Sequence, residues 1–177
     1  MGKIMADISM SLDGYIAGPN PTLKEPLGEG GEALHDWVVR LASWRKPHGL
    51  SGGETGPDGD VMEESVANIG AVIMGRRMFS GGDGPWESEP NPDGWWGDTP
   101  PFHVPVFVLT EHKRETVTKK GGTSFVFVTD GIHSALAQAK KAAGDKDILI
   151  AGGANAIQQF IQAGLVDELQ IHLVPIL

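Results

Sequence analysis

The feature that most constrains the fold is the alternation of short apolar runs with segments of helical periodicity. The runs are continuous and apolar, as expected for strands buried on both faces, and they cover residues 71–74, 105–110, 124–129 and 147–153. Segments with helical spacing follow the last two, over 132–143 and 154–164. Strands that alternate with helices need crossover connections, which are typical of parallel sheets. The sequence therefore predicts an α/β fold with a mostly parallel sheet flanked by helices.

The rest of the chain supplies further elements. Residues 3–10 alternate apolar and polar positions and predict a strand, and residues 166–177 predict a final long strand. Residues 30–44 place apolar side chains at helical spacing and predict an amphipathic helix of about three turns. Asp60 is predicted to cap a second helix over 61–68. Segments 46–59 and 80–104 are rich in Gly and Pro and are predicted to be loops.

Composition limits the possible functions. A chain of 177 residues is most simply one domain, here 1–177. Its net charge of −9 argues against nucleic-acid binding, which needs clustered cations. The absence of cysteine excludes disulfides, Cys-ligated zinc and thiol catalysis, and it fits a reducing cytosol. No apolar run approaches the roughly 20 residues of a membrane span, and no signal-peptide core is present. We expect a cytoplasmic protein without a membrane partner.

The histidines give no indication of a metal site. Those at 48, 103, 112, 133 and 172 show no pairing at i, i+4, which is the spacing that puts two imidazoles on one helix face. The sequence therefore predicts no metal.

The junction at Gly152 and Gly153 carries the strongest local signal for a ligand. A buried strand ends in this glycine pair, and a helix begins almost at once. Glycines let a ligand approach the backbone, and the free amides of a first helical turn favour an anion such as phosphate. The pattern is not the GxGxxG fingerprint, and a glycine pair here is also compatible with a simple turn.

The stretch MGRRMF at 74–79 repeats this arrangement, with Arg76 and Arg77 at the presumed helix start. Cations at a helix N-terminus oppose the macrodipole, at a cost of roughly 0.3–1 kcal/mol each, unless an anion accompanies them. The alternative is a solvated pair or salt bridges to carboxylates. A third strand end offers Thr110, followed by His112, Lys113 and Arg114. Three strand ends thus carry backbone or side-chain groups that suit a phosphate.

Taken in order, five motifs resemble the dihydrofolate reductase superfamily. They are ISMSLDGYIAG, VIMGRRMF, VFVLT, ILIAGGANAIQQFI and LVDELQIHLVPIL, and together they span most of the chain. The branch that they resemble most is the C-terminal reductase domain of the bifunctional riboflavin-biosynthesis deaminase-reductase. This resemblance implies a three-layer fold, an NADPH-dependent reductase and a homodimer. It also implies a further strand or two after the position that matches the end of this chain.

The resemblance implies a role for each matching position. Gly75, Arg76 and Arg77 match the stretch that holds the adenosine end, where an arginine pairs with the 2′-phosphate, and Thr110 matches a hydroxyl residue at the same end. Gly152, Gly153, Ala154 and Asn155 match the glycine turn and helix start beneath the pyrophosphate. Ile16, Ala17 and Gly18 match the loop that meets the nicotinamide carboxamide. Glu111 departs from this pattern, because its carboxylate would repel a 2′-phosphate unless it points outward. The preference for NADPH over NADH is therefore left open.

Reduction of a C=N or C=O bond also needs a proton donor, commonly a carboxylic acid. The candidates are Glu32 and Asp36, with His35 beside them, and Asp13 in the SLDGYIAG loop. The alternative is structural, since acids stabilise a first helical turn and Asp-Gly is a common turn pair.

The function implied is NADPH-dependent reduction of a small nitrogen heterocycle, most like 5-amino-6-(5-phosphoribosylamino)uracil in riboflavin biosynthesis. One alternative is dihydrofolate reductase, although no residues match the pterin-binding pattern cleanly. A nucleotide- or flavin-binding module without turnover is an alternative of another class. Trp86, Trp95 and Trp96 could stack on the substrate, but we favour a role in a local core or a subunit interface.

Overall fold

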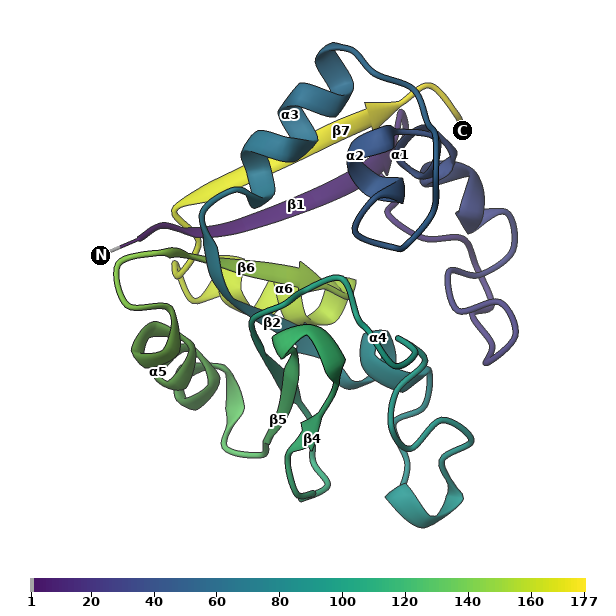
Figure 1. Cartoon of the computed structure of the whole chain (residues 1–177). Helices are drawn as coiled ribbons and strands as arrows, with labels where there is room; N and C mark the ends of the chain where they lie inside the picture. The colour runs from purple at the N-terminus through teal and green to yellow at the C-terminus, as the bar shows by residue number, and fades with distance from the viewer. Residues whose placement is uncertain (1) are drawn as a thin grey trace. The chain divides into compact units, whose positions relative to one another are not determined.

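The computed structural model describes residues 2–177 and contains a seven-stranded sheet with the order β4-β5-β3-β2-β6-β1-β7 (Figure 1). The strands are β1 (Ile4–Ser11), β2 (Ile69–Gly75), β3 (Pro105–Leu109), β4 (Val117–Thr118), β5 (Ser124–Val128), β6 (Asp147–Gly152) and β7 (Glu168–Val174). The pairs β1–β6, β6–β2, β2–β3 and β3–β5 are parallel, and β4 pairs antiparallel with β5. The predicted α/β class with a mostly parallel sheet is confirmed.

The chain divides into two compact units that share strands β1 and β7. The first unit comprises the chain up to Asp7 together with Ile69–Gln170, and the second comprises Ile8–Asn68 together with Ile171–Leu177. Each is described by itself below.

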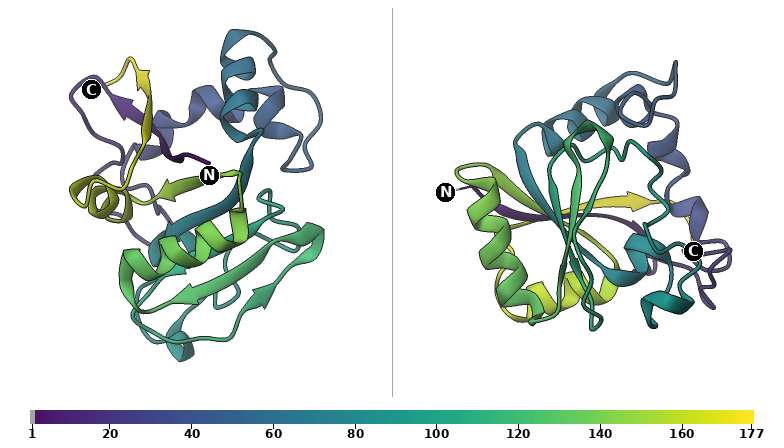
Figure 2. Two further views of the ribbon diagram at one scale, coloured as in Figure 1. Left: turned by 90° about the vertical axis from the view of Figure 1, so that its left-hand side faces the viewer. Right: turned by 60° about the horizontal axis from the view of Figure 1, so that its bottom comes forward.

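The core of the first unit lies on both faces of its sheet. Side chains alternate between the two faces of the sheet along a strand, so β2 and β3 each place apolar side chains on both faces. One set forms a buried cluster of Val72, Met74, Phe79, Val106, Val108 and Phe125. Helix α5 (Gly131–Ala143) packs against β2 and β3, and α6 (Ala154–Gln162) packs against β6 and β2 (Figure 2).

The loop after α4 (Arg76–Ser80) brings tryptophans into this core. Trp86 packs edge-on against Phe79 and Phe127, with ring centroids 6.1 and 4.9 Å apart. Trp96 packs against Phe102 at 4.8 Å, and Trp95 donates a hydrogen bond from Nε1 to the Met78 carbonyl at 3.0 Å. Trp86 and Trp96 thus pack against the core of the first unit, as the interpretation of a local core predicts.

The second unit corrects the predicted helix over 30–44. This segment forms three short pieces, the 3-10 turn Gly31–Leu34, α1 (Asp36–Val39) and α2 (Ala42–Arg45). Leu41 is extended, with φ −70° and ψ 139°, and forms a bridge with Glu54. The Ala42 amide donates to the Glu54 carbonyl at 2.9 Å, and the Glu54 amide donates to the Arg40 carbonyl at 2.8 Å. Pairing with a distant residue therefore interrupts a pattern that is locally helical.

Helix α3 (Pro57–Val66) begins earlier than predicted, and Asp60 is not its cap. Pro57 opens the helix, where its fixed φ suits the helix and its missing N–H costs no hydrogen bond. Asp60 lies within the first turn instead, where a carboxylate still favours the helix dipole.

Candidate functional site

The carboxyl ends of β2, β3 and β6 meet at one edge of the first unit. In register, Gly75 lies beside Leu109, and Met74 lies beside Gly152. Thr110 directly follows β3, and its amide donates to the Val128 carbonyl of β5 at 3.1 Å. The first-unit residues predicted for a ligand therefore come from adjacent strand ends, which is where open α/β sheets bind their ligands.

Backbone atoms approach each other closely at the glycines of this edge. A Cβ placed on Gly75 would lie 3.6 Å from the Gly153 nitrogen and 3.7 Å from the Gly152 oxygen. Gly152 has φ +127°, a conformation that favours glycine, and its peptide bond to Gly153 is cis. Around a Cβ at Gly153 there would be open space. The two glycine segments thus bring backbone atoms together in a glycine surface made by Gly75, Gly152 and Gly153, beside the Ala156 methyl group and Met78 Sδ.

Helix α6 begins directly after this surface. Gly153 is its N-cap residue and is extended, and no side chain accepts a hydrogen bond from the first turn. Asn155, one of the predicted residues, accepts a hydrogen bond at Oδ1 from Gln159 Nε2 at 2.5 Å, while Ala154 opens the helix. Uncapped first-turn amides beside a glycine surface suit a pyrophosphate.

Arg76 is held inside the protein. Its side chain forms an ion pair with Glu89 at 2.8 Å, in which both side chains are almost completely buried. The guanidinium lies over the Trp86 ring, 3.5 Å from the centroid, and donates hydrogen bonds to Ser80 Oγ and to the Gly82 carbonyl. Burial lowers the pKa of Arg76 below its usual range, and the bond to Glu89 partly restores it. Arg76 thus forms a salt bridge to a carboxylate, which was the alternative to a phosphate partner in the sequence analysis.

Arg77 lies outside, where it forms an exposed ion pair with Asp83 at 2.5 Å. An exposed pair of this kind contributes at most about 1 kcal/mol, so a ligand anion could compete with Asp83 for this side chain. The role of either arginine at a cofactor stays a prediction.

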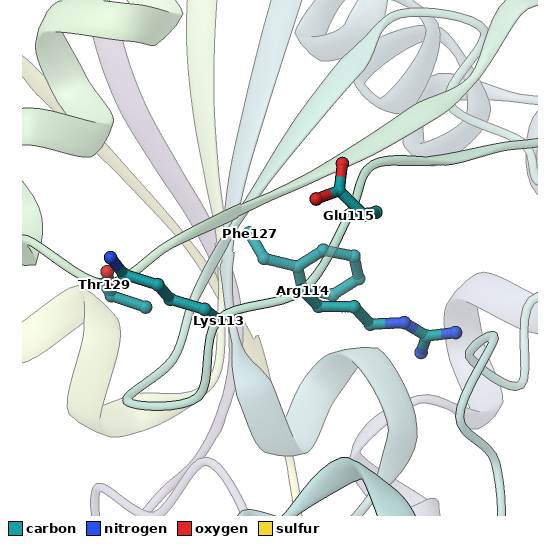
Figure 3. Close-up of a pocket in the computed structure, with 5 residues that line it drawn as sticks. All are labelled: Lys113, Arg114, Glu115, Phe127 and Thr129. Carbon is teal, nitrogen blue, oxygen red and sulfur yellow. The ribbon is translucent and has the colours of Figure 1, made fainter.

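A pocket of about 470 Å³ opens beside the ends of β3 and β5 (Figure 3). Its lining residues are Lys113, Arg114, Glu115, Phe127 and Thr129. The sequence drew attention to Lys113 and Arg114 as cations after a strand, but Phe127 and Thr129 were missed. The signal for them was available, because both belong to the apolar run 124–129, whose carboxyl end lies beside β3 in a parallel sheet.

The predicted acids belong to the second unit, and Asp13 has a structural role there. The Ser11 hydroxyl donates to Asp13 Oδ1 at 2.6 Å, and the Tyr15 amide donates to the same hydroxyl at 2.9 Å. These bonds close the turn after β1, so Asp13 has the structural role that the sequence analysis gave as the alternative to proton donation.

Glu32 and Asp36 are both exposed. Glu32 lines a pocket of about 220 Å³ within the second unit, together with Glu25, Leu27, Gly28, Gly30 and Ala33. Asp36 begins α1, where its carboxylate favours the helix dipole. Burial lowers the pKa of His35, which lies between them, below its usual range, against smaller opposing effects of Gly31 and Asp36.

The loop predicted to meet a nicotinamide packs against a second glycine-rich segment. The Gly18 amide donates to the Leu27 carbonyl at 2.7 Å, and a Cβ on Gly18 would lie 2.1 Å from the Glu29 oxygen. Only glycine fits there. Ile16 is half-buried and Ala17 is exposed.

Taken with the fold, these features define a class: an α/β protein with a glycine turn at a helix N-terminus and a cationic pocket at the carboxyl ends of parallel strands. The RibD C-terminal domain family matches residues 2–177, and the chain belongs to this family. Membership supports a reductase-like role and confirms the branch that the motifs resemble.

The proteins similar to this chain include one from Bacillus subtilis and one from Shewanella sp. PV-4. The chain is 26% identical over 185 residues to the uncharacterized protein YyaP of Bacillus subtilis (strain 168), covering 98% of this chain and 75% of YyaP. A crystal structure of a "putative riboflavin biosynthesis protein" from Shewanella sp. PV-4 has a TM-score of 0.56 and 23% identity, covering 99% of this chain and 78% of that one. The latter likeness shows the fold.

Within residues 2–177, no group of three His, Cys, Asp or Glu side chains could hold a metal ion. Over the same residues, no helix has both the length and the apolar character needed to span a bilayer.

Proposed function

We propose that the protein is an NADPH-dependent reductase that delivers hydride to a small nitrogen heterocycle, most like the pyrimidine reduced in riboflavin biosynthesis. One observation carries the proposal: Gly75 faces Gly152 and Gly153 at the uncapped start of α6. The open space around the Cβ position of Gly153 leaves room for a phosphate-bearing ligand against the backbone, and membership in the RibD C-terminal domain family supports the chemistry.

The residues at this edge fit a dinucleotide. A Cβ on Gly75 would lie against the Gly153 nitrogen, at 3.6 Å, so an added methyl group there would hinder a ligand from reaching that amide. Gly153, Ala154 and Asn155 would hold the pyrophosphate through the first-turn amides of α6. Thr110 would contribute its hydroxyl, which already accepts a hydrogen bond from the His112 amide at 3.2 Å. When bound, NADPH supplies the hydride.

The chain must also supply a proton, and we assign this role to Glu32. Glu32 lines the pocket of the second unit, whereas Asp13 accepts a hydrogen bond from Ser11 and Asp36 begins α1. We expect Glu32→Gln to lose at least about a hundredfold in turnover, in the range of general acid catalysis, with NADPH affinity retained. Asp36→Asn, a matched change of one exposed acid, should retain turnover. Equal losses in both variants would contradict the assignment.

The test of the proposal as a whole combines binding and turnover. NADPH binding is followed by energy transfer from tryptophan to the reduced nicotinamide, and turnover by the absorbance of NADPH with candidate pyrimidines and with dihydrofolate. The proposal predicts binding in wild-type protein, lost in Gly75→Ala, and oxidation with a pyrimidine. Binding without oxidation of any acceptor would indicate a nucleotide-binding module, and preferential oxidation with dihydrofolate would indicate a dihydrofolate reductase.

The proposal includes a cytoplasmic location and a homodimer, both expected from the sequence and the family resemblance. Light scattering coupled to size-exclusion chromatography tests the oligomeric state, and a monomer at micromolar concentration would contradict the expected homodimer.

A further inference from the structure

The part of β7 that belongs to the second unit has an unusual distribution of polar and apolar side chains. Ile171 and Leu173 lie on one face of the strand and are 45% and 59% exposed, whereas His172 lies on the opposite face and is half-buried. A strand with one covered face normally turns its apolar side chains toward that face. A covered polar side chain with large apolar neighbours outside is therefore informative. The imidazole occupies a position where packing alone favours an apolar residue.

Trp37, from α1, packs against this imidazole. The centroids of the two rings lie 4.4 Å apart, and their planes are tilted by 34°. Trp37 Nε1 donates a hydrogen bond to Ser9 Oγ of β1 at 3.0 Å. Ser9, Trp37 and His172 are all half-buried, so part of each remains accessible. These three residues, which we call the Trp37–His172 cluster, bring together an indole, an imidazole and a hydroxyl within the second unit.

The hydrogen-bonding groups of the Trp37–His172 cluster suit the edge of a planar heterocycle. The indole donor of Trp37 is already used by Ser9, so the accessible part of the indole offers an aromatic surface. The Ser9 hydroxyl accepts that bond and keeps its own hydrogen to donate, and a neutral imidazole carries one acceptor nitrogen. A ring edge on which an N–H group stands beside a C=O group is complementary to these two side chains.

We infer that the Trp37–His172 cluster is a subsite for the ring of a uracil-type pyrimidine, and that His172 determines specificity by accepting a hydrogen bond from a ring N–H. This inference rests on the proposed function and names the residues that recognise the substrate ring. Glu32 keeps the role of proton donor, because a hydrogen bond to the ring edge holds the substrate without moving a proton. The alternative is that His172 only fills space beside Trp37.

Calorimetric titration with 5,6-diaminouracil and with 5,6-diamino-1,3-dimethyluracil tests the inference without turnover. Methyl groups replace both ring N–H groups in the second compound. Wild-type protein should bind 5,6-diaminouracil at least about tenfold more tightly, which corresponds to one hydrogen bond. His172→Ala should reduce this preference to less than about twofold, and His172→Asn, which keeps an acceptor, should restore part of it. His133→Ala, on the exposed side of α5, should leave the preference unchanged.

The indole N–H signals of isotope-labelled wild-type protein give a readout that does not depend on the stability of the His172 variants. The Trp37 signal, identified by its loss in Trp37→Phe, should shift saturably as 5,6-diaminouracil is added. Trp44 is a matched control, because it also packs on an imidazole in the second unit, that of His48 at 3.8 Å. Its signal should not shift.

The outcomes separate this inference from the proposed function. If wild-type protein binds neither NADPH nor 5,6-diaminouracil, both fail. If NADPH is oxidised with a pyrimidine while the Trp37 signal stays unchanged, or if His172→Ala keeps the wild-type preference, the inference alone is wrong. If 5,6-diaminouracil shifts the Trp37 signal but NADPH does not bind, the subsite is supported and the reductase assignment is wrong.

Discussion

Arg76 and Arg77 are adjacent in the chain, but they differ in what surrounds them. Arg76 is 6% exposed and surrounded by Glu89, Trp86 and Ser80, whereas the Arg77 side chain is 71% exposed and meets only Asp83 in an ion pair. A buried charge without its partner is costly, whereas an exposed one is solvated by water. The two arginines should therefore respond very differently to substitution.

We predict that Glu89→Gln destabilises the protein by about 3–5 kcal/mol, because it leaves the Arg76 charge buried without a counter-ion. Asp83→Asn, which removes a carboxylate from the exposed pair, should cost less than about 1 kcal/mol. Urea unfolding gives both values. Equal, small losses would mean that the Arg76–Glu89 pair is open to solvent.

His35 gives a prediction about pH. Burial lowers its pKa in the folded state, and Nδ1 is buried without a hydrogen-bond partner. As the pH falls through the ordinary histidine pKa of about 6.5, the unfolded chain takes up a proton before the folded chain does, so stability falls with it. The contribution is fully present above that pKa and is lost as the pH falls to the lowered folded value.

His35→Gln should remove this contribution. Free energies of unfolding measured between about pH 7.5 and pH 5 should fall less steeply for the variant than for the wild type. Parallel curves for the two proteins would show that the imidazole is accessible to protons in the folded state.

At the scale of elements, the junction between β6 and α6 depends on backbone conformation. Gly152 has φ +127°, and a Cβ there would lie 3.3 Å from Met78 Sδ. Gly75 is extended, with φ −78°, and a Cβ there would make ordinary contacts. Gly152 is needed for the turn itself, whereas Gly75 keeps the Gly153 nitrogen uncovered by a side chain.

We predict that Gly152→Ala destabilises the protein by about 1–3 kcal/mol, because alanine rarely adopts this φ. Gly75→Ala should change stability by less than about 0.5 kcal/mol and should act on ligand binding instead. Thermal unfolding of the two variants, with and without NADPH, distinguishes these effects. A large loss of stability in Gly75→Ala would contradict the role assigned to it.

The elements that could be predicted from the sequence are those determined by local pattern. The continuous apolar runs became β2, β3, β5 and β6, and the helical segments after β5 and β6 became α5 and α6. The prediction of one helix over 30–44 was wrong because Leu41 pairs with Glu54, a contact that local periodicity cannot predict. The same limit applies to Arg76, whose partner Glu89 lies in an irregular loop.

At the scale of the whole molecule, the two units carry different chemistry. The first holds the glycine surface, the N-terminus of α6 and the pocket lined by Lys113 and Arg114, which are features suited to phosphates. The second holds the candidate proton donors, among which Glu32 lines a pocket. We expect substitutions in the first unit to affect cofactor affinity, and Glu32→Gln to affect turnover alone.

The central claim is that the strand ends of the first unit bind NADPH through backbone amides. A titration of isotope-labelled protein with NADPH, followed by amide chemical shifts, tests it most directly. We predict that Gly75, Thr110, Gly153 and Asn155 show large saturable shifts, which Gly75→Ala abolishes. Unchanged amides at these four positions, with shifts elsewhere or none at all, would contradict the account.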